Sequence, residues 1–443
     1  EPHPTLGYLV SEFMESRVRV NTDSSFTLLS KDQVVIPRHL WYTQRVNACR
    51  HANGRDWWII VSEADSPIYY AYILSPDGVH LDHQGDVGVI LKYGLGQSAF
   101  SPNGNYMARM DAVTVEEGQY ITLFSFDRCS GELSLVDQFH TETGYFTGVA
   151  FSPSERYLYA DDNTHLWQWD LLADDIASSQ TLVDTFDGFI EPGWFGTYFA
   201  PMALAPDGRI YIAPTSGGSR RFHVIDRPDL PSPDCRFLQH HIFLDKWNAR
   251  SMPNIPNFRL GPIDGSPCDT LGINKIPVAR WRWEQDQPDF DQLIRFTDLS
   301  FYNPQEWHWD FSDVMTSDSA NPLHMFDPGL YYVCLTVSND YGSDTTCHYV
   351  RVFATGVQEV EEKNIPDISI LPNPFSDQLI IETKSEEFRE AQIQLYDMHG
   401  RIVFNHDLII PSTIYLPNFP SGIYLCNIKD ANGSGRSVKL MKE

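Results

Sequence analysis

The stretch Phe100-Ser101-Pro102-Asn103-Gly104-Asn105-Tyr106-Met107-Ala108 decides the fold, because its pattern occurs four times along the chain. Its central turn aligns with three others: Ala52-Asn53-Gly54, Pro153-Ser154-Glu155 and Pro206-Asp207-Gly208. The middle residues of successive turns are 50, 51 and 53 positions apart. Each turn leads into a strand-like segment, and a further strand follows. Four such units cover roughly residues 44–265.

A strand, a turn and another strand at a period near 50 are typical of the blades of a β-propeller. A four-stranded blade must bury its faces against its neighbours. Several unrelated hairpins in a sandwich are the alternative interpretation. Residues 1–43 resemble part of another blade, and propellers have about four to eight blades. We therefore expect a β-propeller over residues 1–274 that is incomplete at its N-terminal end.

Composition supports an all-β, modular chain. A length of 443 residues predicts about two to four domains, and the 13% of aromatic residues together with 28 Gly and 29 Pro favour strands joined by many turns. The net charge of −27 argues against a nucleic-acid partner. No apolar run is long enough for a transmembrane segment. The chain begins at Glu1 without a leader, so we expect either a removed signal peptide or a fragment.

Residues 278–354 form a separate pattern of alternating strands. Three motifs follow one another in it: Trp307–Asp313 (WHWDFSD), Asn321–Phe326 (NPLHMF) and Gly329–Asp344 (GLYYVCLTVSNDYGSD). In this order they resemble the PKD-type immunoglobulin-like domain, which implies a small β-sandwich. Ser312 and Val314 stand where that family usually has glycine, so we expect an altered turn there.

Residues 367–443 again show short alternating strands, after an acidic, turn-rich linker at 355–366. Their motifs are Leu371–Phe375 (LPNPF), Gln394–Val403 (QLYDMHGRIV), Gly422–Ile428 (GIYLCNI) and Val438–Lys442 (VKLMK). They resemble the type A C-terminal sorting domain of the type IX secretion system of Bacteroidota. The residues that carry this sorting motif are Pro372, Asn373, Pro374, Asp397, Gly400, Gly422 and Tyr424.

This second resemblance implies another immunoglobulin-like sandwich that acts as an address for export. It implies passage through the periplasm and outer membrane, with the type IX secretion machinery as a partner. The protein is then secreted or held at the cell surface. Disulfides can form along that route.

Cys334 and Cys347 lie at equal distances from a turn centred on Asp340-Tyr341. They therefore face each other across two antiparallel strands, where paired Cβ atoms are about 4.5–5.5 Å apart. We predict a disulfide between them.

Cys235 and Cys268 bracket the end of the repeat region, and a second disulfide between them is predicted to close the last blade. A bridge between Cys49 and Cys129 is a weaker hypothesis. Cys426, in a strand-like stretch, is interpreted as a buried free thiol.

The sequence shows no catalytic, cofactor or metal site. It has no C-x-x-C or H-E-x-x-H motif, no nucleophile elbow and no phosphate loop. His51 is better explained by a turn bonded to its own backbone than by a channel site. The pair Asp161-Asp162 is better explained by a solvated turn than by a calcium site. Trp281, Trp283 and Trp307 are explained by core packing more simply than by a sugar-stacking surface.

These observations favour a non-catalytic role in binding or display, with an extracellular glycan or protein as ligand. The alternative is a propeller enzyme (a lyase, lactonase or glycosidase) whose site is assembled from dispersed blade loops. A structural surface-layer or adhesion role is a third hypothesis. Ionisable groups clustered at the channel mouth would favour the enzyme. A lining of small or apolar residues would favour binding.

Overall fold

The computed structural model describes residues 2–3, 7–8, 12–36, 46–63, 65–91, 96–114, 118–141, 148–191, 195–215, 218–248, 251–253, 255–285, 293–352, 368–383, 389–396, 402–417, 419–429 and 435–442. The chain divides into two compact units, Glu1–Phe353 and Ala354–Glu443. The described residues are almost entirely β-structure, with one 3-10 turn, η1, at Ala177–Ser179. The linker expected at 355–366 lies outside the described residues.

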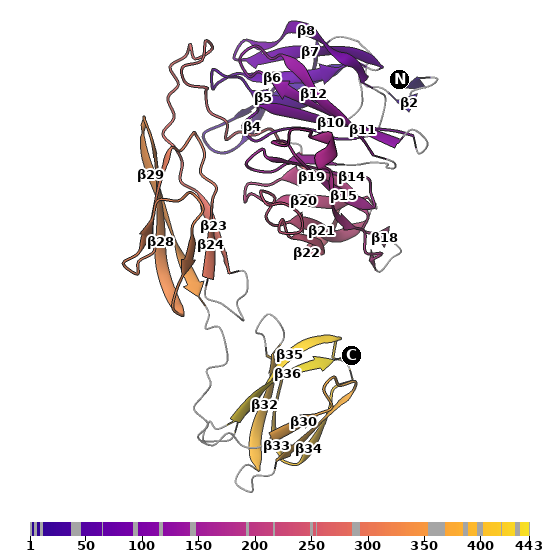
Figure 1. Ribbon diagram of the computed structural model, residues 1–443, viewed down its shortest axis with the longest axis vertical. Coiled ribbons are helices and arrows are strands. Elements are labelled where there is room, and N and C mark those ends of the chain that lie inside the picture. Colours follow the sequence, from indigo (N-terminus) through magenta and orange to yellow (C-terminus); the bar gives the residue numbers. More distant parts are fainter. Residues whose placement is uncertain are drawn as a thin grey trace. The chain divides into compact units, whose positions relative to one another are not determined.

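Four four-stranded antiparallel sheets follow one another in the first unit, each with its strands in chain order (Figure 1). Blade 1 consists of β5 (Asn47–Arg50), β6 (Trp57–Ser62), β7 (Ser66–Ser75) and β8 (Gly78–Leu91). Blade 2 consists of β9 (Ser98–Phe100), β10 (Tyr106–Thr114), β11 (Gly118–Phe126) and β12 (Leu133–Thr141). Blade 3 consists of β13 (Val149–Phe151), β14 (Tyr157–Asp161), β15 (His165–Asp170) and β16 (Thr181–Thr185). Blade 4 consists of β19 (Phe199–Leu204), β20 (Ile210–Pro214), β21 (Ser219–Ile225) and β22 (Phe237–Asn248), after a small hairpin of β17 (Ile190–Glu191) and β18 (Phe195–Gly196).

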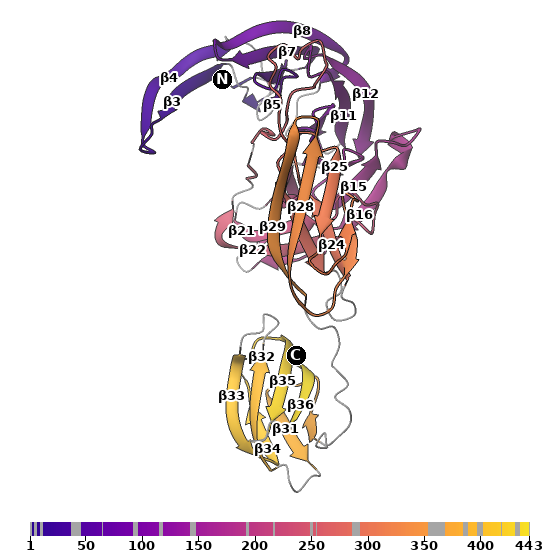
Figure 2. The same ribbon diagram turned by 90° about the vertical axis from the view of Figure 1, so that its left-hand side faces the viewer.

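The blades stack as the repeat predicts. Their first strands lie side by side, β5 next to β9, β9 next to β13 and β13 next to β19. A separate apolar core fills each space between neighbours; Trp58 and Phe124, for example, share the core between blades 1 and 2. Figure 2 shows the described blades along an open arc rather than a closed ring. The propeller architecture is thus confirmed by four blades.

The repeated turns hold the backbone in the left-handed region. The residues at this position are Gly54 (φ 75°), Gly104 (φ 75°), Gly208 (φ 79°) and Glu155 (φ 63°). Glycine adopts this conformation without steric cost, whereas the Cβ atom of Glu155 makes it costly for that residue. The Glu155 carboxylate accepts hydrogen bonds from the Asn103 amide nitrogen (2.6 Å) and from Asn105 Nδ2 (2.8 Å). These bonds join the turns of blades 2 and 3 and offset the backbone strain.

An N-terminal hairpin of β3 (Phe13–Val20) and β4 (Phe26–Ile36) lies beside blade 1 (Figure 2). Phe13 and Val35 pack against Val61 and Tyr72, on the face of blade 1 opposite to the one that meets blade 2. This is the position of a neighbouring blade, as expected for residues 1–43. Two short strands, β1 (Pro2–His3) and β2 (Gly7–Tyr8), also pair.

The rest of the first unit is a β-sandwich. One sheet has the order β23 (Trp281–Gln285), β24 (Leu293–Asp298), β27 (Leu323–Met325). The other has the order β26 (Thr316–Ser317), β25 (Glu306–Asp310), β28 (Gly329–Asn339), β29 (Gly342–Val352). Trp281 and Trp309 are buried between them, and Trp283 and Trp307 pack against the same core. Core packing therefore explains these tryptophans, as the sequence indicates.

The turn at the altered glycine positions keeps the left-handed backbone. Ser312 has φ 58° and Val314 has φ 70°. Two hydrogen bonds offset the steric cost of this backbone conformation at Ser312. Its amide nitrogen donates to Asp310 Oδ1 (2.8 Å), and its hydroxyl donates to the Tyr332 carbonyl (2.7 Å). The Val314 side chain is fully exposed, so its branched Cβ meets no neighbour across the turn.

The structure has the predicted disulfide between Cys334 and Cys347, which are directly paired residues of β28 and β29. It closes a loop with a sequence separation of 13. We expect Cys334→Ser to lower the free energy of unfolding under oxidising conditions by about 3 kcal/mol, because the unfolded chain loses a cross-link. Thermal unfolding measured with and without reductant checks this. A melting temperature equal to that of the oxidised wild type would contradict it.

The predicted disulfide between Cys235 and Cys268 is wrong. Cys268 is bonded to Cys129, with 5.6 Å between the Cα atoms, and the weaker Cys49–Cys129 hypothesis fails for the same reason. Cys235 is a free thiol buried in the core between blades 3 and 4. The chain after blade 4 returns to the turn after β11, where Cys129 lies, so the bridge forms between segments 139 residues apart.

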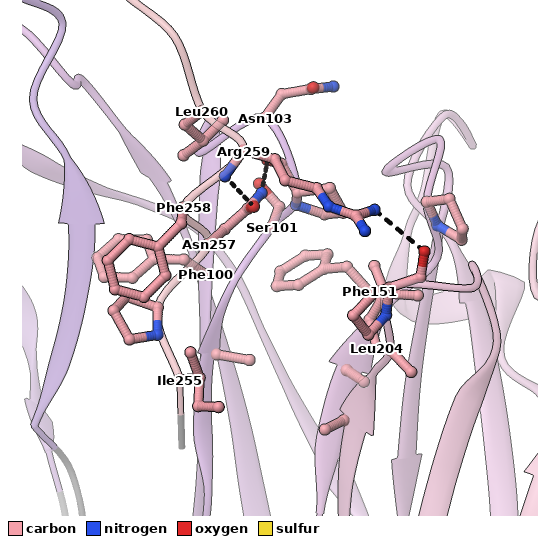
Figure 3. Close-up of a pocket in the computed structure, with 18 of the residues that line it drawn as sticks. Phe100, Ser101, Asn103, Phe151, Leu204, Ile255, Asn257, Phe258, Arg259 and Leu260 are labelled. Carbon is pink, nitrogen blue, oxygen red and sulfur yellow. Dashed lines mark hydrogen bonds between the residues drawn. The ribbon is translucent and has the colours of Figure 1, made fainter. Parts of the chain in front are cut away.

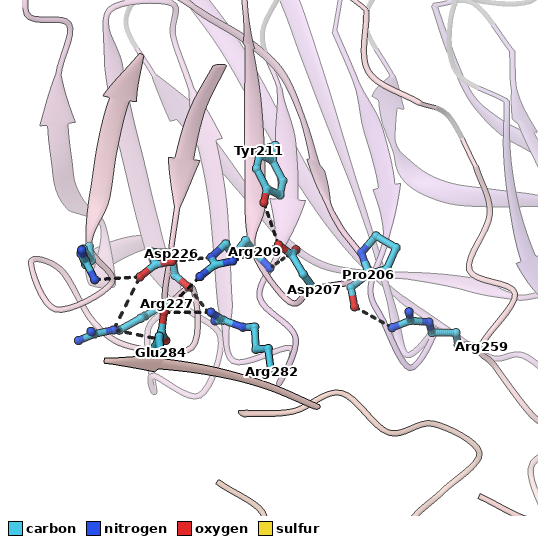
Figure 4. A network of polar contacts seen from close by, with 10 residues as sticks. Pro206, Asp207, Arg209, Tyr211, Asp226, Arg227, Arg259, Arg282 and Glu284 are labelled. Carbon is cyan, nitrogen blue, oxygen red and sulfur yellow. Dashed lines mark hydrogen bonds and ion pairs between the residues drawn. The ribbon is translucent and has the colours of Figure 1, made fainter. Parts of the chain in front are cut away.

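Blade 4 contacts the PKD-like sandwich through a network of charged groups (Figure 4). Arg209 of blade 4 contacts Asp226 (2.5 Å) and reaches across to Glu284 of β23 (3.2 Å). Arg282 of the sandwich donates to the Asp226 carbonyl (3.0 Å). Burial alone would lower the pKa of Arg209, but its hydrogen bond to Asp226 and the nearby carboxylates together raise it. The two modules therefore meet through an ordered polar interface.

The second unit is also a β-sandwich. Its sheets have the orders β30 (Ile368–Leu371), β31 (Gln378–Thr383), β34 (Ser412–Tyr415) and β33 (Ile402–Ile409), β32 (Glu390–Tyr396), β35 (Gly422–Lys429), β36 (Gly435–Lys442). A single apolar core lies between them and includes Phe375 and Cys426, which is the predicted buried free thiol.

The described residues of the expected sorting motif lie beside the same stretch of β36, where Gly422 and Tyr424 pair with Lys442 and Leu440. Asn373, between Pro372 and Pro374, donates to the Lys439 carbonyl (2.8 Å) and accepts from the Met441 amide nitrogen (2.9 Å). Tyr424 is buried and donates to the Pro420 carbonyl (2.7 Å), and Gly422 begins the same strand. Asp397 and Gly400 lie outside the described residues. The LPNPF segment thus anchors the last strand of the chain.

Candidate functional site

A cavity of about 1910 Å³ lies against the first strands of the four blades. Its lining includes the first strands β5, β9, β13 and β19 with the repeated turns that follow them, and Phe222 and Ile242 of blade 4. It also includes the strap (defined as residues 251–253 and 255–264) and the loop at 298–304 of the PKD-like sandwich. Figure 3 shows Phe151 and Leu204 of the blades on one side and Phe258 of the strap on the other.

The blade side of the cavity is a closely packed wall. Gln97 joins three blades, because its Oε1 accepts from the amide nitrogens of Val149 (3.3 Å) and Met202 (3.0 Å). Its Nε2 donates to the Met202 carbonyl (2.6 Å). A Cβ at Gly148 would lie 2.6 Å from the Ala200 carbonyl oxygen, so β13 and β19 approach closely. The described first strands of blades 2 to 4 are therefore held close to one another.

The strap is fixed to three blades. Asn257 Nδ2 donates to the Pro102 carbonyl of blade 2 (2.7 Å), and Arg259 donates to the Pro206 carbonyl of blade 4 (3.0 Å; Figures 3 and 4). The Ile263 amide nitrogen donates to the Ala52 carbonyl of blade 1 (2.9 Å). The strap thus crosses the ends of the blades at their repeated turns.

Arg128 is the buried cation beside the strap. It donates to the carbonyls of Arg50 (2.8 Å) and Gly261 (2.6 Å), while its own carbonyl accepts from Trp58 Nε1 (2.8 Å). Burial lowers the pKa of the Arg128 guanidinium. Because its donors are engaged by backbone carbonyls, this arginine serves structure. The neighbouring Cys49 thiol is buried, which raises its pKa to about 12 and makes it a poor nucleophile.

The strap presents apolar side chains at the cavity. Ile255 is 70% exposed and Phe258 is 57% exposed, although both line it. Phe258 contacts Trp57 edge-on with 5.1 Å between ring centroids. Exposed apolar groups opposite an apolar wall suit an apolar ligand surface.

The sequence candidates outside the cavity have structural partners. His51 Nδ1 accepts from the Asn53 amide nitrogen (2.9 Å), which confirms the turn interpretation. Burial lowers the pKa of His51. Among the residues that the structure describes, no group of three metal-ligating side chains is present.

The pair Asp161-Asp162 is not a solvated turn, so that interpretation is wrong. Asp161 is fully buried, and its carboxylate accepts from the amide nitrogens of Gly148 (2.8 Å) and Asn163 (3.1 Å). Burial raises the pKa of Asp161. Asp162 is buried as well and accepts from the His165 amide nitrogen (2.7 Å). Both carboxylates organise the loops around the end of β14.

Sequence reasoning missed a buried ion pair on β10 of blade 2. Arg109 Nε contacts Asp111 Oδ1 at 3.0 Å, and both side chains are almost completely buried. The sequence pattern does indicate this pair, because Arg109 and Asp111 alternate along β10 with apolar residues. The side chains of Ala108 and Met110 point to the opposite face of the strand.

Two family models match parts of the chain. Residues 369–443 match the secretion system C-terminal sorting domain, and residues 274–354 match the PKD domain. No curated protein is similar to this chain. Within the described residues, no helix is long and apolar enough to cross a membrane.

Solved structures give distant likenesses. The PKD1 domain of a Vibrio cholerae metalloprotease is 29% identical over 18% of this chain and 100% of that domain, with a TM-score of 0.17. A putative 6-phosphogluconolactonase from Bacteroides uniformis is 10% identical, covering 90% of this chain and 94% of its own, with a TM-score of 0.34. The periplasmic gluconolactonase of Pseudomonas aeruginosa is 10% identical, and the match covers 90% of this chain and 97% of the gluconolactonase, with a TM-score of 0.29. At these scores the likenesses carry no argument about activity.

The fold and the matched domains define a modular exported protein with a propeller, a PKD domain and a sorting domain. It is a cargo of type IX secretion and is delivered to the cell surface or the extracellular space. The sorting domain implies contact with the secretion machinery.

Proposed function

We propose that this exported protein has a non-catalytic binding or display role and that the cavity against the propeller wall is its recognition site. The observation that carries the proposal is the lining: apolar side chains of the blades face exposed apolar side chains of the strap. Ligand sites are typically large concavities that combine apolar side chains with polar groups.

Four of the five charged groups in the described lining support binding rather than catalysis. The fifth is Asp264, whose pKa is raised by burial and whose side chain is hydrogen-bonded to Tyr341. Arg128 and Arg259 donate to backbone carbonyls. Asp298 accepts from Trp307 Nε1 (2.8 Å) and from the Ser300 amide nitrogen (3.0 Å). Lys275 lies over the Tyr302 ring, 5.5 Å from its centroid. Each of these groups has a structural partner among the described residues, whereas general acid–base catalysis needs a group aimed at the substrate.

A binding screen of the full chain against extracellular glycans and proteins tests the proposal. For any ligand found, we expect Ile255→Asp to weaken binding by about tenfold, because it places a charge in an apolar contact. Leu172→Asp is the matched control, because Leu172 is also exposed (74%) but lies outside the cavity. Equal binding by both variants would contradict the cavity assignment. Turnover of a lactone or glycoside by the wild type would contradict the non-catalytic role.

A further inference from the structure

Arginine and aromatic side chains alternate along the outer part of blade 4. The members, in spatial order, are Trp247, Arg220, Phe243, Arg221, Phe189 and His240, and we call them the arginine–aromatic row. The Arg220 guanidinium carbon lies 5.1 Å from the Trp247 ring centroid and 4.7 Å from that of Phe243. The Arg221 guanidinium lies 4.8 Å from Phe243 and 5.9 Å from Phe189. Phe189 stacks on His240 with 4.3 Å between centroids.

This row lies apart from the cavity. Arg221 of β21 is directly paired with Phe243 of β22, and the next pair, Phe222 and Ile242, lines the cavity. Because successive side chains of a strand point to opposite faces, Arg221 and Phe243 lie on the other face of blade 4. Further along that face, His223 is buried. The arginine–aromatic row therefore lies on the face of blade 4 opposite to the cavity, next to the part of that face that is buried.

Two carboxylates hold the row in place. Glu191 is 2% exposed, and its Oε2 accepts from the Ser219 hydroxyl (2.6 Å) and from the Arg220 amide nitrogen (2.8 Å). Its Oε1 lies 3.6 Å from Arg220 Nε, an ion pair too long for a hydrogen bond. At the other end, Asp187 Oδ2 contacts His240 Nε2 at 2.7 Å. The side chains are therefore positioned before any ligand arrives, which lowers the entropic cost of binding.

The row offers both positive charge and flat apolar surface. Arg221 has no ion pair within the described part of the chain, and the Arg220 side chain is 38% exposed. The Nε atoms of both arginines are buried and have no hydrogen-bond partner among the described residues, so a ligand would meet the outer nitrogens of the guanidinium groups. Phe243 is 50% exposed and Trp247 is 57% exposed. A matching ligand carries a carboxylate and a flat face of C–H groups. Arginine binds carboxylates through paired hydrogen bonds, and aromatic rings stack on apolar faces.

We propose that the arginine–aromatic row binds glycans that contain uronic acid. The sugar ring stacks on Trp247 or Phe243, and its carboxylate accepts hydrogen bonds from Arg221 and Arg220. A neutral glycan would leave the charge of Arg221 unmatched. A nucleic acid would meet only two arginines in the row, too few to neutralise a dense run of phosphates. The proposal is independent of the cavity and requires only that the exported protein meets extracellular polysaccharide.

Calorimetric titration of the full chain with trigalacturonate, and with galactotriose as the neutral match, tests the proposal. We expect trigalacturonate to bind and galactotriose to bind at least about tenfold more weakly, because the charged hydrogen bonds are lost. Trigalacturonate affinity should also fall as salt rises, since the contact is partly electrostatic. Equal binding of both sugars, or no binding of trigalacturonate, would overturn the proposal.

Variants locate the site. We expect Arg221→Met and Trp247→Ala each to weaken trigalacturonate binding by about tenfold. Trp247 is exposed, so this variant folds even if Arg221→Met does not. Arg17→Met and Tyr349→Ala are matched controls, since both side chains are exposed and distant in sequence from the row. A loss in the controls as large as in the row variants would overturn the assignment, as would a loss caused by the cavity variant Ile255→Asp.

Discussion

Deletion of residues 367–443 leaves the protein in the periplasm, whereas the full chain reaches the cell surface or the medium. This result is expected because those residues form the sorting domain that matches the secretion model. They also form a unit with its own core, and among the residues that the structure describes the cores of the first unit end at Val352. The retained protein should therefore be folded.

Cell fractionation in a Bacteroidota host measures this, with limited proteolysis of the periplasmic fraction as the test of folding. As a positive control, residues 367–443 fused to a passive reporter should carry the reporter to the surface. Normal surface delivery of the deletion variant would refute the sorting assignment. Degradation of the variant in the periplasm would instead show that the first unit needs the second for stability.

The double variant Cys129→Ser/Cys268→Ser should lose about 5 kcal/mol of unfolding free energy. The disulfide closes a loop with a sequence separation of 139, and long loops restrict the unfolded chain most. In the folded state the same bond holds the end of the strap beside blade 2. Loss of the bond should therefore also expose the strap to proteases.

Denaturant unfolding and protease cleavage within 251–264 measure these two effects. The matched control is Cys334→Ser/Cys347→Ser, which removes the disulfide that closes the shorter loop. This variant should lower the free energy of unfolding by about 3 kcal/mol without changing cleavage of the strap. An unchanged unfolding midpoint of the first variant would show that the strap is held by its hydrogen bonds alone.

Local patterns predicted the elements of this fold well. The turn repeat located four blades, because each blade repeats the same left-handed turn, and even Glu155 follows the rule by bonding to the neighbouring turn. The disulfide in the PKD-like sandwich followed from hairpin symmetry, since its cysteines are directly paired across one turn.

Contacts between distant segments could not be predicted in this way. The bond of Cys268 to Cys129 depends on the return path of the strap, which no local pattern records. The burial of Asp161 depends on amide nitrogens of neighbouring loops. The arginine–aromatic row arises where an irregularity in the pairing of β21 and β22 brings Arg220 beside Trp247.

The charged interface between blade 4 and the PKD-like sandwich has a hydrodynamic consequence. Because Arg209 and Arg282 bridge the two modules, propeller and sandwich should tumble in solution with one rotational correlation time. The Arg209 and Glu284 side chains are only 27% and 11% exposed, and salt screens such partly buried pairs much less than exposed ones, so the two modules should keep one correlation time as the ionic strength rises.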